Sequence, residues 1–293
     1  MVVRNSIVGI NNPVELQGAL NNAQYIADME LATAGYLSLA LQKPLLLEGA
    51  PGVGKTEAAK AIASVLGRQV VRLQCFEGID VSSSMYEWNY PAQMLAIRQA
   101  NEGFVNIYAV NFLLERPLLA ALRHPNDCVL LIDEVDRSDH EFEAFLLEFL
   151  SDFQISIPET GTVRATNPPV VVLTSNRTRD LHEALRRRCV YHWINYPHPE
   201  LEAAIVMARA SSVAQATANA VVSAVNHLRE QPLVKPPGVA ETVEWSEAAT
   251  LLNAQGATWP DAFKRSIGVA LKDHDDLEYT RHQLDDLLAG TAA

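Results

Sequence analysis

The sequence is poor in cysteine and has no long apolar run. Its three cysteines, Cys75, Cys128 and Cys189, lack the close spacing of a disulfide framework or a zinc site, so we expect reduced thiols buried at strands. No uncharged apolar run approaches the roughly 18 residues that suggest a membrane span, and the first residues lack the basic and apolar layout of a signal peptide. We therefore expect a cytoplasmic protein with no transmembrane segment.

Basic residues are scarce relative to acidic ones. The chain has 23 lysines and arginines against 35 aspartates and glutamates, which gives a formal net charge of −12. A negative surface repels polyanions, so we expect no nucleic-acid partner, although composition leaves open a local basic groove. With 293 residues, 48% of them hydrophobic, the chain is long enough for one or two globular domains.

Short apolar runs alternate with amphipathic segments over the first two thirds of the chain. The runs have the composition of buried parallel strands and cover Leu45–Glu48, Gln69–Leu73, Cys128–Asp133, Pro169–Thr174 and Val190–Ile194. The segments between them have helical spacing and include Thr56–Leu66, Ala92–Ala100, Phe112–Leu122 and His140–Phe149. This alternation predicts an α/β fold, a five-stranded parallel sheet with helices on both faces.

A phosphate-loop motif follows the first predicted strand. It reads Gly49-Ala50-Pro51-Gly52-Val53-Gly54-Lys55-Thr56, the Walker A pattern, and a predicted helix follows it. Glycines let the backbone curl around phosphates, so that N–H groups meet the negative charge. We expect Lys55 to reach the β- and γ-phosphates of ATP and Thr56 to ligate Mg²⁺, with Glu57 adjoining the nucleotide. The alternative is a glycine turn that fits the pattern by chance.

A Walker B pattern ends the third predicted strand. Four apolar residues lead into Asp133 and Glu134. We expect Asp133 to hold the metal and Glu134 to orient and deprotonate the attacking water. Acids often follow strands, so this pattern gains its meaning from the phosphate loop that precedes it in the same predicted sheet.

Two further segments carry candidate catalytic groups. Asn176 follows the fourth predicted strand and is placed to bind the γ-phosphate or the water, although an asparagine there can also cap a turn. Arg186, Arg187 and Arg188 precede the fifth strand, and one of them is a candidate arginine finger for a neighbouring subunit's γ-phosphate. The alternative is a solvated basic helix end.

The last third of the chain has a different character. Its alanine-rich amphipathic segments predict helices at Glu200–Ala210, Gln215–Arg229, Ser246–Asn253 and Asp261–Leu271. We expect an N-terminal segment at 1–24, an α/β nucleotide-binding domain at 25–196 and a small all-α lid domain at 197–293, whose last dozen residues are loosely held.

The motifs together resemble those of AAA+ ATPases, and more narrowly the MoxR branch. The resemblance runs from about Tyr25 to Trp245, with 173–178 as sensor 1 and 181–189 as the finger segment. It implies a homo-oligomer, typically a hexameric ring, with ATP at subunit interfaces. Register within the family makes Arg188 the first choice of finger and Arg187 the second.

Within that branch the chain looks most like the CoxD type, the ATPases of aerobic carbon monoxide dehydrogenase maturation. The similar stretches are 72–78, 86–91, 112–117 and 235–242. This resemblance implies an ATP-driven chaperone for a molybdenum-containing hydroxylase and a partner with a von Willebrand A domain. One departure concerns the lid arginine called sensor 2, because the segment around Gly238 offers Glu241 in its place, with Lys235 as a possible substitute.

Two segments between the motifs are candidate client contacts. Met85–Tyr90 concentrates three aromatic residues in a predicted loop or short insertion, and its aromatic side chains are either exposed or tucked under the sheet edge. Phe153–Val163 predicts a β-hairpin, because isoleucines alternate before the turn at Gly161.

Three other functions share a phosphate loop. A small-molecule kinase does not need the paired acids with a following arginine segment, and a GTPase needs an Asn-Lys-x-Asp segment that the sequence lacks. A DNA-remodelling ATPase such as a clamp loader is disfavoured by the acidic charge. The sequence therefore favours an ATPase that remodels a partner protein.

Overall fold

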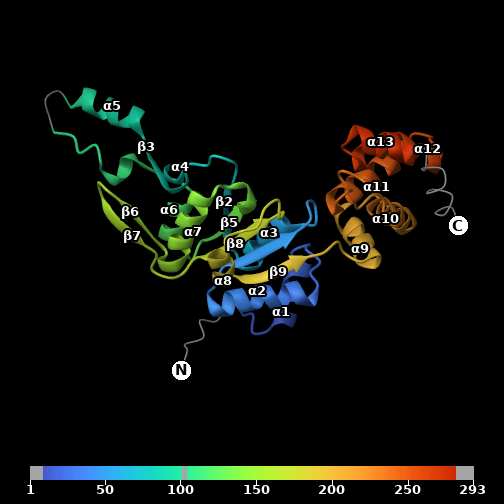
Figure 1. Cartoon of the computed structure of the whole chain (residues 1–293), viewed down its shortest axis with the longest axis horizontal. Coiled ribbons are helices and arrows are strands. Elements are labelled where there is room, and N and C mark those ends of the chain that lie inside the picture. Colours follow the sequence, from blue (N-terminus) through green and yellow to red (C-terminus); the bar gives the residue numbers. More distant parts are fainter. Residues whose placement is uncertain (1–8, 101–103, 282–293) are drawn as a thin grey trace. The chain divides into compact units, whose positions relative to one another are not determined.

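A parallel sheet forms the centre of the α/β part of the molecule. The computed structural model describes residues 9–100 and 104–281. Five strands pair in the order β2-β5-β8-β1-β9, with helices on both faces (Figure 1). Their bounds are Leu45–Gly49 (β1), Gln69–Gln74 (β2), Cys128–Asp133 (β5), Val170–Ser175 (β8) and Val190–Ile194 (β9). The five predicted strands and the α/β fold are therefore confirmed.

The register of the sheet brings polar strand ends to one edge. Gln74 of β2 lies opposite Asp133 of β5, and Glu48 of β1 lies opposite Ser175 of β8. Apolar residues fill the strands behind these ends, and Leu130, Leu131 and Ile132 are completely buried. A strand that is buried on both faces and ends in charge delivers that charge at the carboxyl edge of the sheet, where ligands bind in open α/β folds.

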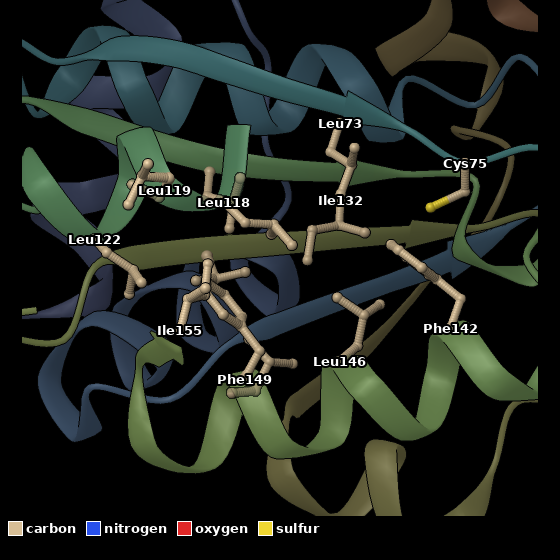
Figure 2. Close-up of a cluster of buried hydrophobic side chains, with 14 of the residues drawn as sticks. Leu73, Cys75, Leu118, Leu119, Leu122, Ile132, Phe142, Leu146, Phe149 and Ile155 are labelled. Atoms are coloured by element: carbon tan, nitrogen blue, oxygen red, sulfur yellow. The ribbon is translucent and has the colours of Figure 1, made fainter. Parts of the chain in front are cut away.

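Helices cover the sheet through apolar side chains. The helices of this part are α1 (Pro13–Asn22), α2 (Met29–Leu41), α3 (Lys55–Val65), α4 (Val81–Met85), α5 (Tyr90–Gln99), α6 (Pro117–Arg123), α7 (His140–Asp152) and α8 (Glu183–Arg188). Figure 2 shows Leu118 of α6 and Phe142 of α7 packed with Ile132 of β5. Asp139 caps α7 by accepting a hydrogen bond from the Phe142 N–H group, which fixes where this helix begins.

The segment before α6 corrects a prediction. Helix was expected over Phe112–Leu122, but the 3₁₀ turn Val110–Phe112 and the strand β4 (Leu113–Glu115) come first, and the helix begins at Pro117. Proline is suited to a first helical position, and the residue before it is steered away from helix. β4 pairs antiparallel with β3 (Tyr86–Trp88), so a loop over Met85–Tyr90 is wrong, whereas the alternative of a short insertion stays a prediction.

Between β3 and β4 the chain extends away from the five-stranded sheet and contains α5 (Figure 1). We call the described residues between these two strands, 89–100 and 104–112, the arm. Trp88 is buried, whereas several apolar side chains of the arm are exposed: Tyr90, Met94, Leu95, Ile97 and Phe104. The hairpin predicted over Phe153–Val163 is confirmed as β6 (Gln154–Ile157) paired with β7 (Gly161–Arg164).

The last part of the chain is helical. It contains α9 (Pro199–Arg209), α10 (Gln215–Arg229), α11 (Val239–Ala254), α12 (Trp259–Ala270) and α13 (His274–Arg281). The four predicted helices are confirmed, although α11 begins well before Ser246. Trp245 of α11 is completely buried and packs edge-on against Phe263 of α12. The prediction that the last dozen residues are loosely held lies outside the described residues.

Internal contacts divide the described chain into two units. The α/β unit comprises the described residues up to Ala23 together with Ala27–Glu48 and Thr56–Trp193. The helical unit comprises Gln24–Ile26, Gly49–Lys55 and the described residues from Ile194 onward. The proposed boundaries at 1–24, 25–196 and 197–293 stay a prediction.

The three cysteines are free thiols, with Cys75 and Cys128 buried and Cys189 half-buried. Burial, followed by the nearby Asp133, Asp136 and Glu134 carboxylates, raises the pKa of Cys75 to about 12. This thiol is therefore protonated at neutral pH.

Candidate active site

The predicted phosphate loop connects β1 to α3 and requires its glycines. Gly52 and Gly54 have φ angles of +77° and +93°, a left-handed conformation that glycine adopts without strain. A Cβ atom on Gly49 would lie 2.3 Å from the Ile194 carbonyl oxygen, and one on Gly52 would lie 2.9 Å from the Gly238 Cα atom. The backbone thus turns tightly where the Walker A pattern predicts a phosphate cradle.

Lys55 holds its ammonium group over this loop. The side chain is buried, and its Nζ atom donates hydrogen bonds to the carbonyl oxygens of Gly49 at 2.8 Å and Ala50 at 2.7 Å. Phosphate oxygens are stronger acceptors for an ammonium group than neutral carbonyls are. Lys55 thus lies at the phosphate loop. To bind the β- and γ-phosphates as predicted, its ammonium group has to leave these two carbonyl oxygens for phosphate oxygens.

The two predicted metal ligands meet. Thr56 Oγ1 donates to the Asp133 carboxylate at 3.1 Å from Oδ1 and 3.3 Å from Oδ2. The Thr174 hydroxyl donates to Oδ1 as well, and Asp133 is almost fully buried. Hydroxyl and carboxylate oxygens are the hard donors that Mg²⁺ prefers, and Mg²⁺ usually takes its remaining ligands from water and phosphate. The residues present therefore fit a magnesium ion.

Glu134 lies beside this pair in a constrained position. Its φ is +55°, which is uncommon for a residue with a side chain, and its N–H group donates to Thr174 Oγ1 at 2.9 Å. Its carboxylate accepts from Gln74 Nε2 at 3.0 Å and Asn176 Nδ2 at 3.5 Å, and pairs with Arg137 at 3.0 Å. The structure thus brings together Glu134 and Asn176, the predicted base and sensor.

Two residues of β2 were missed by sequence reasoning. Arg72 Nε donates to Asp133 Oδ2 at 2.8 Å, and Gln74 binds both Arg72 and Glu134. A usable signal was present, because Arg72 and Gln74 alternate with Leu73 at the end of a strand next to the Walker B strand. Side chains two residues apart on a strand point to the same face.

A third missed residue is Asp136, a buried acid in the turn after β5. Its carboxylate accepts from the N–H groups of Asn176 at 3.1 Å and Thr178 at 2.9 Å, and from the Thr178 hydroxyl at 2.7 Å. Burial alone would raise the pKa of Asp136, but these hydrogen bonds outweigh it and lower the pKa from its ordinary value of 3.8. Asp136 therefore fixes the segment that carries Asn176.

Glu143 of α7 is another buried acid, and it contacts the segment between Asn176 and α8. It is buried, pairs with Arg179, and accepts a hydrogen bond from the His182 N–H group at 2.8 Å. His182 caps α8, the helix that carries the three arginines. The segment after β8 and the start of α8 are thus both attached to α7.

The three arginines differ in their surroundings. Arg186 pairs with the buried Glu48 at 3.4 Å and lies over the Tyr191 ring, whereas Arg187 pairs with the exposed Glu183. Arg188 makes no hydrogen bond or ion pair with the residues that the structure describes. Nor, within residues 9–100 and 104–281, does such a bond join Arg187 or Arg188 to Asp133 or Glu134. The structure thus does not bring Arg187 or Arg188 to the Walker B acids of their own chain.

Residues adjoining the motifs have local partners. Glu57 pairs with Lys60 along α3 at 2.7 Å, and Lys235 pairs with Asp273 at 3.5 Å. In the helical unit, the Val239 N–H group donates to the Gly52 carbonyl oxygen at 3.0 Å. Glu241, the residue in place of the expected lid arginine, accepts from the Gly238 N–H group at 3.1 Å. Its carboxylate therefore caps α11.

Among the described helices, none has the length and apolar character needed to span a bilayer.

Comparisons with solved structures support the fold. A mutant of RuvB from Thermotoga maritima matches 95% of this chain and 79% of its own chain, with a TM-score of 0.53 and 20% identity. Another RuvB structure from that organism, described as a Holliday junction branch migration motor, matches 97% and 80%, with a TM-score of 0.50 and 19% identity. At such identities the likeness shows the fold alone.

Sequence comparisons reach parts of much longer proteins. Human fidgetin-like protein 1 is 30% identical over 166 residues, which is 55% of this chain and 20% of that protein. Human cytoplasmic dynein 2 heavy chain 1 is 42% identical over 73 residues, which is 24% of this chain and 2% of that protein. The chain thus spans a small part of these relatives. Residues 45–195, more than half of the chain, match the model of the ATPase family associated with various cellular activities, and the chain belongs to this AAA family.

Proposed function

We propose that the chain binds Mg-ATP, hydrolyses it to ADP and phosphate, and uses the turnover to remodel a partner protein. The observation that carries the proposal is the meeting of Thr56 with Asp133 next to Glu134 and Asn176. These four side chains come from two strand ends, those of β5 and β8, and from the start of α3, and the sequence predicts a catalytic or metal-binding role for each. A structural role alone does not require two adjacent acids at this edge of the sheet.

Each side chain has a chemical task in this proposal. The loop Gly49–Gly54 and Lys55 hold the phosphates, while Glu134 orients the attacking water and takes its proton. Asn176 holds the Glu134 carboxylate or the water through its amide. Thr56 and Asp133 hold Mg²⁺, which supplies positive charge next to the phosphate oxygens.

The arginine finger is proposed to act on a neighbouring subunit. Arg188 is the first candidate and Arg187 the second, since Arg186 already pairs with Glu48 of its own chain. AAA proteins are typically oligomeric, and we propose a homo-oligomer, a hexameric ring, in which α8 supplies a charge to the adjacent ATP site. The α/β domain at 25–196 and the lid at 197–293 would then be the moving parts of each subunit.

The client is proposed from the resemblance to the MoxR branch and its CoxD type. It is a molybdenum-containing hydroxylase such as carbon monoxide dehydrogenase, with a protein carrying a von Willebrand A domain as a further partner. The exposed apolar side chains of the arm around α5 support a protein client. The net charge of −12 supports a protein over nucleic acid, although the structurally similar RuvB is described as a branch migration motor.

Phosphate release tests the ATPase proposal. We expect steady turnover with Mg²⁺, none in EDTA, and a loss of at least about a hundredfold in Lys55→Ala, because the ammonium group stabilises charge on the phosphates. Arg123→Ala is the matched control, since Arg123 pairs with Glu115 outside the candidate site. Turnover by Lys55→Ala at the wild-type rate would contradict the proposal.

A further inference from the structure

Negative charge is concentrated at the carboxyl end of β5. Asp133, Glu134 and Asp136 lie within four residues, and Asp133 and Asp136 are almost fully buried. A buried carboxylate without a cation or enough hydrogen-bond donors is costly, because burial removes its hydration. The chain without metal therefore needs another source of positive charge or donors at Asp133.

The two oxygens of Asp133 have different partners. Oδ1 accepts from the hydroxyls of Thr56 and Thr174, whereas Oδ2 accepts from Arg72 through Nε at 2.8 Å and through a terminal nitrogen at 2.5 Å, with the Thr56 hydroxyl farther away at 3.3 Å. Arg72 therefore places a positive charge directly on this carboxylate. Its side chain is 51% exposed, although that of Asp133 is only 2% exposed.

The half-exposed position of Arg72 makes its contact exchangeable. An arginine that leaves a partner at the water boundary regains hydration, so the exchange is less costly than it is for a buried pair. A divalent ion next to Asp133 would also repel the guanidinium group, since like charges a few ångströms apart repel each other.

We propose that Arg72 is an internal cation that neutralises Asp133 in the metal-free chain and releases Oδ2 when Mg²⁺ binds. The inference rests on the proposed function, because it assigns the ion to the ATP site. Arg72 thus competes with Mg²⁺ and keeps the empty site ordered.

The exchange also reaches Glu134 through Gln74. Gln74 Oε1 accepts from Arg72, and Gln74 Nε2 donates to Glu134 Oε2 at 3.0 Å. When Arg72 leaves Asp133, the amide that holds Glu134 loses or shifts its other partner. Arg72 is therefore a positioning residue: its movement when Mg²⁺ binds at Asp133 changes, through Gln74, how the Glu134 carboxylate is held.

The free Mg²⁺ concentration that half-saturates binding of a fluorescent ADP analogue tests this inference without turnover. The titration starts from EDTA and compares the wild type with Arg72→Ala, Arg72→Gln and Asp133→Asn. Arg123→Ala serves as the control. We expect Arg72→Ala and Arg72→Gln to lower the half-saturating Mg²⁺ concentration about threefold to tenfold, the size of a partly exposed charge-assisted contact. Asp133→Asn should raise it, and Arg123→Ala should leave it unchanged.

The titration distinguishes failure of the Arg72 role from failure of the proposed ATP site. An unchanged or higher Mg²⁺ requirement in both Arg72 variants, with the expected rise in Asp133→Asn, overturns the role of Arg72 and leaves the metal site intact. If the wild type fails to bind the ADP analogue in Mg²⁺, the proposed function and the inference both fail.

Discussion

Two buried carboxylates of this chain are neutralised in different ways. In the helical unit, Glu202 of α9 is completely buried and receives both terminal nitrogens of Arg229, at 2.7 and 2.8 Å. The Arg229 side chain is only 8% exposed, donates also to the Pro237 carbonyl oxygen, and lies 4.1 Å from the Tyr196 ring centroid. In the α/β unit, the Asp133 side chain is also buried, but the side chain of Arg72, which pairs with it, is half-exposed.

The difference separates a structural ion pair from an exchangeable one. The Glu202–Arg229 pair is buried and holds α9 and α10 together next to α11. Removing one member leaves the other buried and unpaired. Asp133 is held by the hydroxyls of Thr56 and Thr174 and by Arg72, whose half-exposed side chain can return to solvent. Burial of the carboxylate is the same in both places, so exposure of the partner is the feature that indicates function.

The largest expected effect on stability comes from opening the enclosed pair. Arg229→Ala should lower the free energy of unfolding by about 3 to 5 kcal/mol, because Glu202 is then a buried charge without a cation. Denaturant unfolding of the helical unit measures this loss. The double variant Glu202→Leu with Arg229→Met should recover much of it. A loss under about 1 kcal/mol in Arg229→Ala would show that the pair is not the structural element described here.

An intermediate effect is expected at Asp136, a buried acid that is held by hydrogen-bond donors alone. Asp136→Asn should cost about 2 kcal/mol of unfolding free energy, since an amide cannot accept all three donors as a carboxylate does. The folded-state pKa of Asp136 lies below 3.8, so the carboxylate stabilises the fold fully above about pH 3.8 and loses this effect as the pH falls through the folded-state value. The difference between wild type and variant should therefore shrink in acid. A difference that stays constant down to pH 2 would contradict this origin.

The smallest effect belongs to the exchangeable pair. In EDTA, the same Arg72→Ala variant should lose only about 1 kcal/mol of unfolding free energy, because the Thr56 and Thr174 hydroxyls stay on Asp133 and water can take the half-exposed place of Arg72. The contrast between Arg229→Ala and Arg72→Ala measures the two kinds of pair directly. Equal losses in the two variants would remove the distinction.

The sequence predicted the parts of the site that depend on strand ends. Apolar runs located the five strands, and parallel strands bring their carboxyl ends to one edge, so the contacts of Thr56 with Asp133 and of Asn176 with Glu134 could be foreseen. Arg72 also lies near a strand end, but its role requires the register of β2 against β5. Asp136 and Glu143 could not be placed in this way, because their roles depend on side chains from other elements.

Prediction failed where helical spacing and proline gave opposite signals. The leucines and alanines of Phe112–Leu122 fit a helical pattern, but Pro117 begins the helix, and the residues before it pair with β3. That pairing joins two segments that are separated along the chain. The spacing of apolar residues within one segment does not show which other segment it pairs with. The left-handed backbone of Glu134 was likewise not predicted from the motif, although it sets the direction of the carboxylate that we propose to be catalytic.

Glu134 is proposed to activate water on ATP held by Lys55, Thr56 and Asp133, and replacing its carboxylate with an amide tests this role. Glu134→Gln retains the shape of the side chain and removes its basic carboxylate. Nucleotide binding and phosphate release are measured on the same preparation. The account predicts ATP binding within about threefold of wild type and turnover reduced by at least about a hundredfold, the usual contribution of a general base. Unchanged phosphate release by Glu134→Gln would contradict it.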